Sequence, residues 1–168
     1  PEHFDGIYEK IVETKPDIIK IAIQTNDVTD AIPVWKMLER AQNENREIIP
    51  IAMGEAGKWT RILGLAHGAF LTFAALESGD ETAPGQISVQ DLTEIYRVKS
   101  LNKETEVYGI LGGNTSYSMS PLMHNAAFKL CELNKVFIPF QVKSLDEFMQ
   151  RMVHQKTREI DLNFRGFA

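Results

Sequence analysis

The chain has 168 residues, of which 43% are hydrophobic and 24% charged, and its formal net charge is −5. This length fits one domain or two small ones, and the composition is typical of a soluble globular protein. The acidic balance, without a Lys or Arg stripe, argues against a nucleic-acid or anionic-membrane surface, and no stretch approaches the roughly 20 apolar residues of a membrane span.

The first expected elements are a helix over residues 4–14 and a strand over residues 17–23. The strand is a short β-branched run, typical of a strand buried on both faces. Because side chains alternate, Lys20 shares one face with Ile18 and Ala22. If that face is interior, burial disfavours the charged amine, and a neutral amine is suited to imine formation with a ketone. The alternative is an edge strand whose lysine reaches out to water.

Helices and strands then alternate up to residue 98. The expected elements are a helix ending near residue 42, a strand over 48–53, a short helix over 59–65, a strand or strand-like run over 70–76, a polar loop over 77–85 and a helix over 89–98. This alternation predicts right-handed βαβ units and a parallel sheet, an α/β fold class. Pro50 weakens the second strand unless its nitrogen faces an unpaired position. Three open parallel strands are poorly covered, so we expect this segment to belong to something larger.

The pattern restarts after a polar linker at residues 99–105. The expected elements are a strand over 107–111, a glycine turn, a helix with Ser120 as N-cap and Pro121 in its first turn, a strand over 136–142, a capping box at Ser144 and Glu147, and a last strand beginning near residue 164. The helix after Pro121 is predicted to bury Leu122, Ala126, Leu130 and Leu133. The single cysteine, Cys131, excludes an internal disulfide and is expected to be a small core residue rather than a reactive thiol.

A first group of polar residues follows the early strands. Lys20, residues 53–55, Arg61 and residues 82–86 would gather at one rim of a parallel barrel, where such barrels place their sites. Arg61 could grip a carboxylate through two hydrogen bonds. The alternatives are a solvated surface charge for Arg61 and an ordinary turn residue for Gln86.

Four stretches within residues 1–98 resemble type I 3-dehydroquinate dehydratase, in order and spacing: residues 17–22, 51–57, 60–64 and 83–86. The resemblance implies the C-terminal part of a (β/α)8 TIM barrel that uses a Schiff-base lysine. It implies that Lys20 forms an imine with the ring ketone of the substrate and that Arg61 holds its carboxylate. Thr82, where serine is common, and Gln86 would lie in a lid loop that contacts the ring hydroxyls.

A second group lies in residues 109–125, where a strand feeds a glycine turn and a helix N-terminus, a ready anion site. The G-x-G-x-x-G spacing of a dinucleotide site is absent. Ser118 and Ser120 would face the same way in an extended chain and could grip one polar ligand. The alternative is that Ser120 only caps the helix and Ser118 is a loop residue.

Residues 106–168 resemble the start of the substrate-binding α/β domain of shikimate dehydrogenase. The resemblance implies that Ser118 and Ser120 bind the shikimate carboxylate. Tyr117 stands where a histidine is common, which leaves the role of that position open. We therefore expect three segments: barrel over 1–98, linker over 99–105, and substrate-binding domain over 106–168.

The order of the two segments resembles bifunctional enzymes of plants and some bacteria and the end of the fungal pentafunctional shikimate-pathway polypeptide. It implies dehydration of 3-dehydroquinate to 3-dehydroshikimate without a cofactor, then NADPH-dependent reduction to shikimate, in the cytoplasm or, for a plant parent, the plastid. No metal site is expected. The family's proton-transfer histidine, the catalytic residues of the dehydrogenase and its NADP site would lie outside these residues. Because the chain starts at Pro1 without methionine, we expect an internal fragment spanning the junction. The alternative is that the isolated chain is non-catalytic, at most binds substrate, and self-associates through exposed strand edges.

Overall fold

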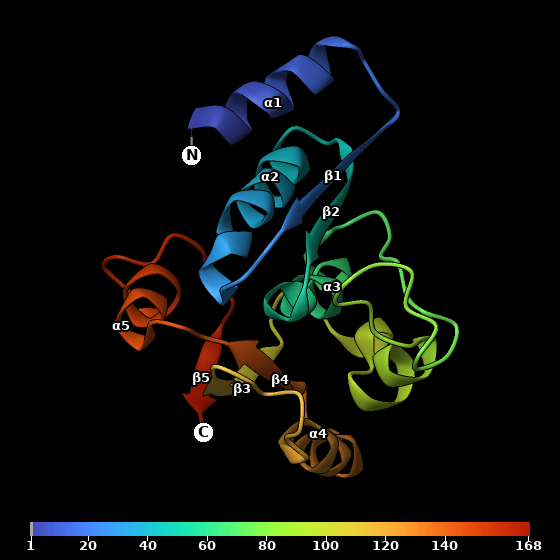
Figure 1. The fold of residues 1–168 in the computed structure, drawn as a ribbon, viewed down its shortest axis with the longest axis vertical. Coiled ribbons are helices and arrows are strands. Elements are labelled where there is room, and N and C mark those ends of the chain that lie inside the picture. Colours follow the sequence, from blue (N-terminus) through green and yellow to red (C-terminus); the bar gives the residue numbers. More distant parts are fainter. Residues whose placement is uncertain (1) are drawn as a thin grey trace.

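Two small parallel sheets organise the chain (Figure 1). The computed structural model describes residues 2–168, with side chains described from residue 4 onward. The strands are β1 (Ile18–Gln24) paired with β2 (Glu47–Met53), and β3 (Glu106–Gly112) lying between β4 (Lys135–Gln141) and β5 (Phe164–Phe167). All pairs are parallel, as the alternation of helices and strands predicts.

Helices connect and cover these strands. They are α1 (Glu2–Glu13), α2 (Ile32–Asn43), α3 (Lys58–Leu63), α4 (Ser120–Leu130) and α5 (Leu145–Phe148), with 3₁₀ turns at Val28–Ala31, Glu55–Gly57, Leu65–His67 and Val98–Ser100 and π-helical turns at Asp91–Ile95 and Met149–Val153. Among the described residues, no helix is long and apolar enough to cross a membrane.

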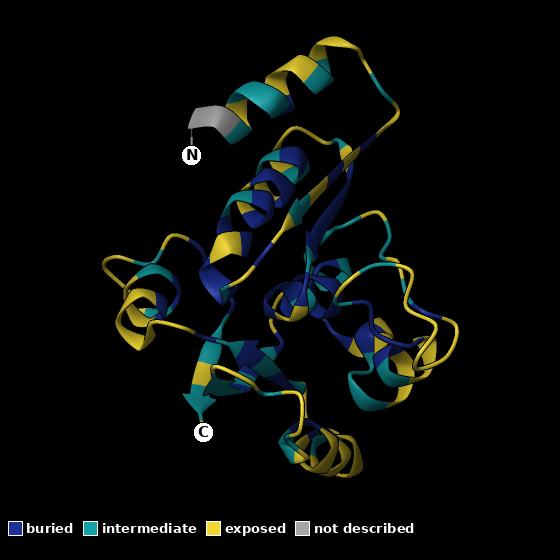
Figure 2. Ribbon diagram, in the orientation of Figure 1, coloured by how far each residue is buried: buried dark blue, intermediate teal, exposed yellow. Residues whose placement is uncertain are grey.

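The first sheet has one buried and one open face. Lys20 lies opposite Ile49 in the parallel register, and the side chains of β1 alternate between exposed and buried (Figure 2). Ile19 and Ile21 belong to the hydrophobic core together with residues of α2. β2 pairs with a single strand neighbour, so its other edge tolerates Pro50.

The third strand predicted before residue 98 is wrong. The stretch over residues 70–76 is irregular: the Phe70 N–H donates to Ile48 O, and Ala75 forms one isolated bridge with Ser88. Contact at its two ends alone does not make a ladder. The helix predicted over 89–98 is also shorter, because it stops at Ile95 and Arg97 then takes a left-handed φ of 52°.

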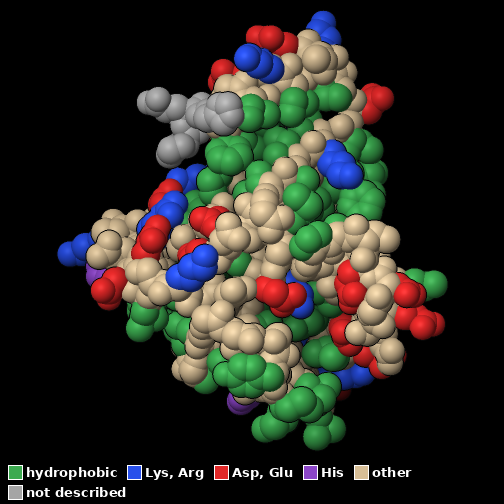
Figure 3. Space-filling model, viewed as in Figure 1, with side chains coloured by type: hydrophobic (Ala, Val, Ile, Leu, Met, Phe, Trp, Pro, Cys, Tyr) green, Lys and Arg blue, Asp and Glu red, His purple; other side chains and the backbone are tan. Residues whose placement is uncertain are grey.

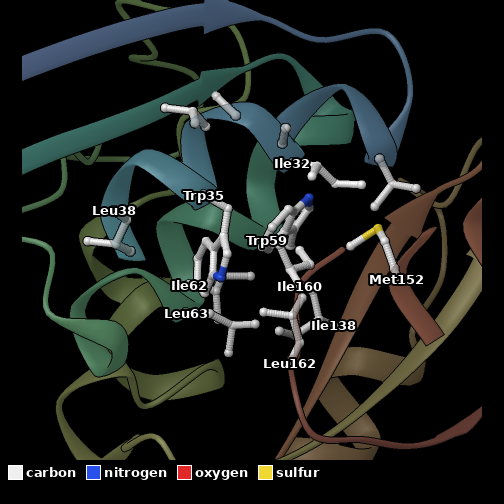
Figure 4. Packing of buried hydrophobic residues seen from close by; sticks show 14 of the residues in the cluster. Ile32, Trp35, Leu38, Trp59, Ile62, Leu63, Ile138, Met152, Ile160 and Leu162 are labelled. Carbon is white, nitrogen blue, oxygen red and sulfur yellow. The ribbon is translucent and has the colours of Figure 1, made fainter. Parts of the chain in front are cut away.

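A continuous core joins the two sheets. The rings of Trp35 and Trp59 lie 4.8 Å apart between centroids, and Figure 4 shows them beside Ile138, Ile160 and Leu162 from the second half. A hydrogen bond reinforces this junction, because the Lys143 N–H donates to Asp27 Oδ2 at 2.7 Å. The two segments therefore pack as one body in this structure.

The face of helix α4 that packs against the protein is opposite to the face predicted to be buried. Leu122, Leu130 and Leu133 are exposed, whereas Pro121 and Asn125 are buried. The reason is polar: the Asn125 amide donates to Phe137 O and accepts from Phe137 N–H, both at 2.8 Å, and so holds α4 against β4. The predicted burial of the apolar stripe is therefore wrong.

The ends of the later helices test the predicted caps. Ser120 is the first residue of α4 rather than its N-cap, which is Met119, so that prediction is wrong. Ser144 does precede α5, and its Oγ accepts the Glu147 N–H at 3.3 Å, which confirms Ser144 as the N-cap. The predicted core role of Cys131 is wrong, because this residue is exposed just after α4.

Candidate active site at the ends of β1 and β2

The carboxyl ends of β1 and β2 form one edge, as parallel pairing requires. The Thr25 N–H and Oγ1 both donate to Met53 O, at 2.9 and 2.6 Å, and hold the two strand ends together. Gly54 follows with a φ of 97°, which favours glycine. This edge carries the loop to α3 and the docking position of the loop over residues 77–86.

Lys20 lies on the open face of β1. Its side chain is exposed along with Ile18 and Ala22, so the predicted interior position is wrong in this structure and the edge-strand alternative fits. The Lys20 Nζ lies 4.6 Å from the centroid of the Phe73 ring, a cation–π contact. The amine is therefore reachable from solvent while the aromatic ring restricts where it can lie.

Arg61 is buried within α3 at 1% exposure, so the alternative of a solvated surface charge is wrong. Its Nη1 donates to Phe73 O at 3.1 Å, whereas its buried Nε has no hydrogen-bond partner. Burial lowers the pKa of the Arg61 guanidinium. Arg61 forms no ion pair with any described residue, and a carboxylate would supply the partner that its Nε lacks.

Phe73 is the residue that sequence reasoning missed. Its backbone oxygen holds Arg61 and its ring holds Lys20, so two predicted site residues meet at one phenylalanine. The sequence signal for Phe73 is an aromatic side chain that follows the Arg61 helix within residues 70–76, where the apolar pattern indicates only a strand.

Thr82 and Gln86 meet in the loop over residues 77–86, which we call the lid loop. The Thr82 N–H and Oγ1 donate to Gln86 Oε1 at 2.8 and 3.2 Å. The Gly54 N–H donates to Pro84 O at 3.0 Å, and Gly85, at a φ of 73°, packs so tightly that a Cβ would overlap the Gly54 carbonyl. The lid loop is thus docked onto the end of β2.

The cavity beneath the lid loop is lined by Glu55, Lys58 and residues 81–86. Lys20 and Arg61 do not line it. The structure therefore assembles the predicted site residues in two pairs, one around Phe73 and one within the lid loop.

The predicted serine pair is only partly realised. Ser118 lines a cavity of about 220 Å³ between the two halves, which Gln86 and Ser116 also line, but Ser120 does not line it. Ser118 Oγ accepts the Ser120 N–H at 3.2 Å. Because Ser120 already belongs to α4, the two hydroxyls do not share a face of extended chain, and that expectation is wrong. Tyr117 is exposed.

Comparison with known proteins decides the family. A family model described as type I 3-dehydroquinase matches residues 1–103, more than half of the chain. The chain belongs to the type I 3-dehydroquinase family. A second model, the shikimate dehydrogenase substrate binding domain, matches residues 110–167. The resemblance to an enzyme junction predicted from the motifs is thereby confirmed.

The relatives of this chain include fused proteins. The chain is 38% identical over 149 residues to the chloroplastic bifunctional 3-dehydroquinate dehydratase/shikimate dehydrogenase of Arabidopsis thaliana, covering 89% of the chain and 24% of that protein. It is 27% identical over 141 residues to the shikimate biosynthesis protein AroDE of Chlamydia pneumoniae, covering 84% and 29%. The chain thus spans about a quarter of the length of these relatives.

Solved structures support the fold. The 3-dehydroquinate dehydratase of Geobacillus kaustophilus aligns with a TM-score of 0.50 and 26% identity over 56% of this chain and 38% of its own. The type I enzyme of Clostridium difficile aligns with a TM-score of 0.50 and 28% identity, covering 60% and 40%. The predicted α/β fold, with part of a type I 3-dehydroquinase barrel, is confirmed.

The glycine turn after β3 does not fit a dinucleotide. Seven residues, 113–119, separate the end of β3 from the start of α4, so no helix N-terminus follows the glycines directly. This turn thus lacks the geometry of an NADP-binding turn. Among the described residues there is also no group of three or more His, Cys, Asp or Glu arranged to hold a metal ion.

Proposed function

We propose that the protein carrying this chain dehydrates 3-dehydroquinate to 3-dehydroshikimate through a Schiff base on Lys20, and reduces the product to shikimate. The observation that carries the first step is the pairing of Lys20 and Arg61 around Phe73. An amine for a ketone and a buried cation for a carboxylate are the two groups that a cyclic keto acid requires.

The chemistry begins when the lone pair of the Lys20 nitrogen attacks the ring ketone. Loss of the ketone oxygen as water gives an imine, whose protonated form draws electrons from the adjacent carbon. A base removes a proton there, the electron pair forms a C=C bond, and the hydroxyl on the next carbon leaves as water. Hydrolysis of the imine restores the ketone and the free amine.

The remaining site residues would orient the ring. We assign the substrate carboxylate to Arg61, whose free Nε and lack of an acidic partner support this role. We assign the ring hydroxyls to Thr82 and Gln86, which the docked lid loop holds together. We assign the proton transfer to a histidine outside residues 1–168.

In the second half, we assign the substrate carboxylate to the hydroxyls of Ser118 and Ser120. The position of Ser118 at a cavity supports its part, whereas Ser120 contributes its N–H to Ser118. NADP would be held by a segment other than this one, because the turn after β3 does not fit it. Residues 1–98, 99–105 and 106–168 are the proposed barrel, linker and substrate-binding segments.

The test uses the full-length polypeptide that carries this chain. Supplied with 3-dehydroquinate, it should generate ultraviolet absorbance from the new C=C bond conjugated to the ketone. When NADPH is then added, it should be oxidised to NADP as the ketone of the product is reduced. Absence of the first signal contradicts the dehydratase assignment, and absence of only the second contradicts the reductase assignment.

The second candidate applies to the 168-residue chain alone, as a non-catalytic segment that at most binds substrate. The exposed position of Lys20 on a two-stranded sheet favours it, because that face is open to water. Dehydration by the isolated chain at the rate of the full-length protein would contradict it. Self-association through strand edges stays a prediction, to be checked by light scattering.

A further inference from the structure

The lid loop carries a one-sided charge. Residues 77–86 contain three acidic residues, Glu77, Asp80 and Glu81, and neither Lys nor Arg. Figure 3 shows acidic side chains gathered over this side of the molecule. A loop of this charge closing over an anionic substrate would be repelled unless a cation lies between them.

One cation lines the cavity beneath the lid loop. Lys58, the first residue of α3, borders that cavity together with Glu55 and Glu81, and it also borders the cavity between the two halves. Its Nζ pairs with Glu55 Oε2 at 2.8 Å, which holds the ammonium group beside another residue that lines the cavity. The side chain of Lys58 is 25% exposed, so its charge is only partly screened by water.

Glu81 is the acidic lid-loop residue that lines the same two cavities as Lys58. Its Oε1 accepts the Gly79 N–H at 3.1 Å, which holds the carboxylate in place. Backbone N–H groups, first that of Gly79, lower the pKa of the Glu81 carboxyl, and the charge of Lys58 lowers it further. The Glu81 carboxylate and the Lys58 ammonium therefore line the same cavities with opposite charges, which favours attraction between the lid loop and α3.

We propose that Lys58 is a positioning residue that holds the acidic lid loop docked on the end of β2, and so places Thr82 and Gln86 over the substrate. The second clause rests on the proposed function, whereas the first concerns the lid loop alone. Lys58 itself lies outside the set of residues to which the dehydration step is assigned.

Two backbone amides report on the state of the lid loop. The Gly54 N–H donates to Pro84 O, across the contact between β2 and the lid loop, and the Thr82 N–H donates to Gln86 Oε1 within the loop. The Gly54 bond breaks when the lid loop lifts, so hydrogen exchange at this amide measures its opening without substrate or turnover, whereas the Thr82 amide reports on order within the loop.

The decisive experiment compares Lys58→Met, Lys58→Arg and Lys36→Met in the full-length protein. Lys36 pairs with Glu159 away from the lid loop and serves as the matched control. Lys58→Met should raise exchange at Gly54 about three-fold, as expected for a partly exposed ion pair. Lys58→Arg should restore the original rate, and Lys36→Met should leave it unchanged. Unchanged exchange in Lys58→Met would overturn the proposal.

Single carboxylate variants show which partner matters. Glu81→Gln should raise exchange at Gly54 as much as Lys58→Met does. The variant that combines both changes should show no faster exchange than either single variant. If Glu55→Gln raises exchange at Gly54 and Glu81→Gln does not, Lys58 acts through its own helix and the proposal is overturned. High salt should accelerate exchange at Gly54 in the original protein more than in Lys58→Met.

Kinetics tests the link to the substrate. Lys58→Met should raise KM for 3-dehydroquinate several-fold and change kcat less, because it weakens placement of the lid loop rather than imine formation. A fall in kcat at unchanged KM would overturn the positioning role. Absence of dehydration in the original protein contradicts the proposed function, whereas the exchange data still decide whether Lys58 holds the lid loop.

Discussion

Two loops of this chain begin alike and end differently. After β2, Gly54 bonds to Pro84 O, and α3 begins at Lys58 with every residue after it buried. After β3, Gly113 has open space around it, and α4 begins seven residues later with most of its surface exposed. The loop after β2 is held by the lid loop and by buried α3, which carries the Arg61 guanidinium. The loop after β3, which carries Ser118, has fewer close contacts.

The difference between the two loops shows which features allow a strand end to bind a ligand. Parallel strands bring polar residues to one edge in both halves, but placement alone does not direct them at a ligand. In the first half, burial of α3 leaves the Nε donor of Arg61 unpaired, which favours an incoming anion. In the second, Ser118 already accepts a hydrogen bond from Ser120. We therefore expect substitutions in the first loop to cost more than those in the second.

The largest effect should follow Lys20→Met in the full-length protein. Removing the amine that forms the imine should lower kcat for dehydration by at least about 10³-fold. In the 168-residue chain, where the side chain is exposed, it should leave the free energy of unfolding nearly unchanged. Lys36→Met is the control. Steady-state kinetics and thermal unfolding check both parts, and retention of more than about a tenth of the original kcat would contradict the assignment.

The next effect should follow Arg61→Met. Loss of a charge-assisted contact should reduce kcat/KM for dehydration by about 10- to 100-fold. Stability should stay equal or rise by about 1 kcal/mol, because an unpaired buried charge is replaced by an apolar side chain of similar length. Thermal unfolding that showed a large loss instead would mean that Arg61 has a structural role.

A smaller effect should separate two glycines. Gly85→Ala places a Cβ against the Gly54 carbonyl at a positive φ, so the lid loop should undock at a cost of about 1–3 kcal/mol, seen as a higher KM for 3-dehydroquinate. Gly113→Ala meets open space and should leave both reactions within about two-fold of the original. Equal effects of the two changes would remove the contrast between the loops.

The smallest effect should follow Leu130→Ser. Leu130 is 85% exposed on α4, so the free energy of unfolding should change by less than about 0.5 kcal/mol. Leu63→Ala in α3, by contrast, should cost about 2–5 kcal/mol. Chemical denaturation of both variants checks the pair, and a large loss for Leu130→Ser would show that this face is covered.

The sequence predicts strands and their order well where apolar runs are continuous. The parallel pairing of β1 with β2, including Pro50, and the strands of the second sheet follow from alternation and turn residues. The stretch over residues 70–76 has the same apolar character but forms backbone hydrogen bonds with its neighbours only near its ends, a tertiary property that no local pattern contains.

Side-chain orientation is harder to predict than the elements themselves. The apolar stripe of α4 predicts the wrong buried face, because the Asn125 amide pairs with the backbone of β4 and fixes the rotation of the helix. The sequence places Lys20 on the correct strand, but its exposure depends on which elements lie over that face. Resemblance identifies Arg61 and Gln86, whereas the role of Phe73 in joining Lys20 to Arg61 requires coordinates.

The proposed imine on Lys20 can be trapped covalently. The full-length protein is treated with 3-dehydroquinate and borohydride, which reduces an imine to a stable secondary amine, and its peptides are then analysed by mass spectrometry. We expect one adduct, on the peptide that contains Lys20. An adduct on a different lysine, or no adduct, would overturn the assignment of Lys20 as the imine-forming residue.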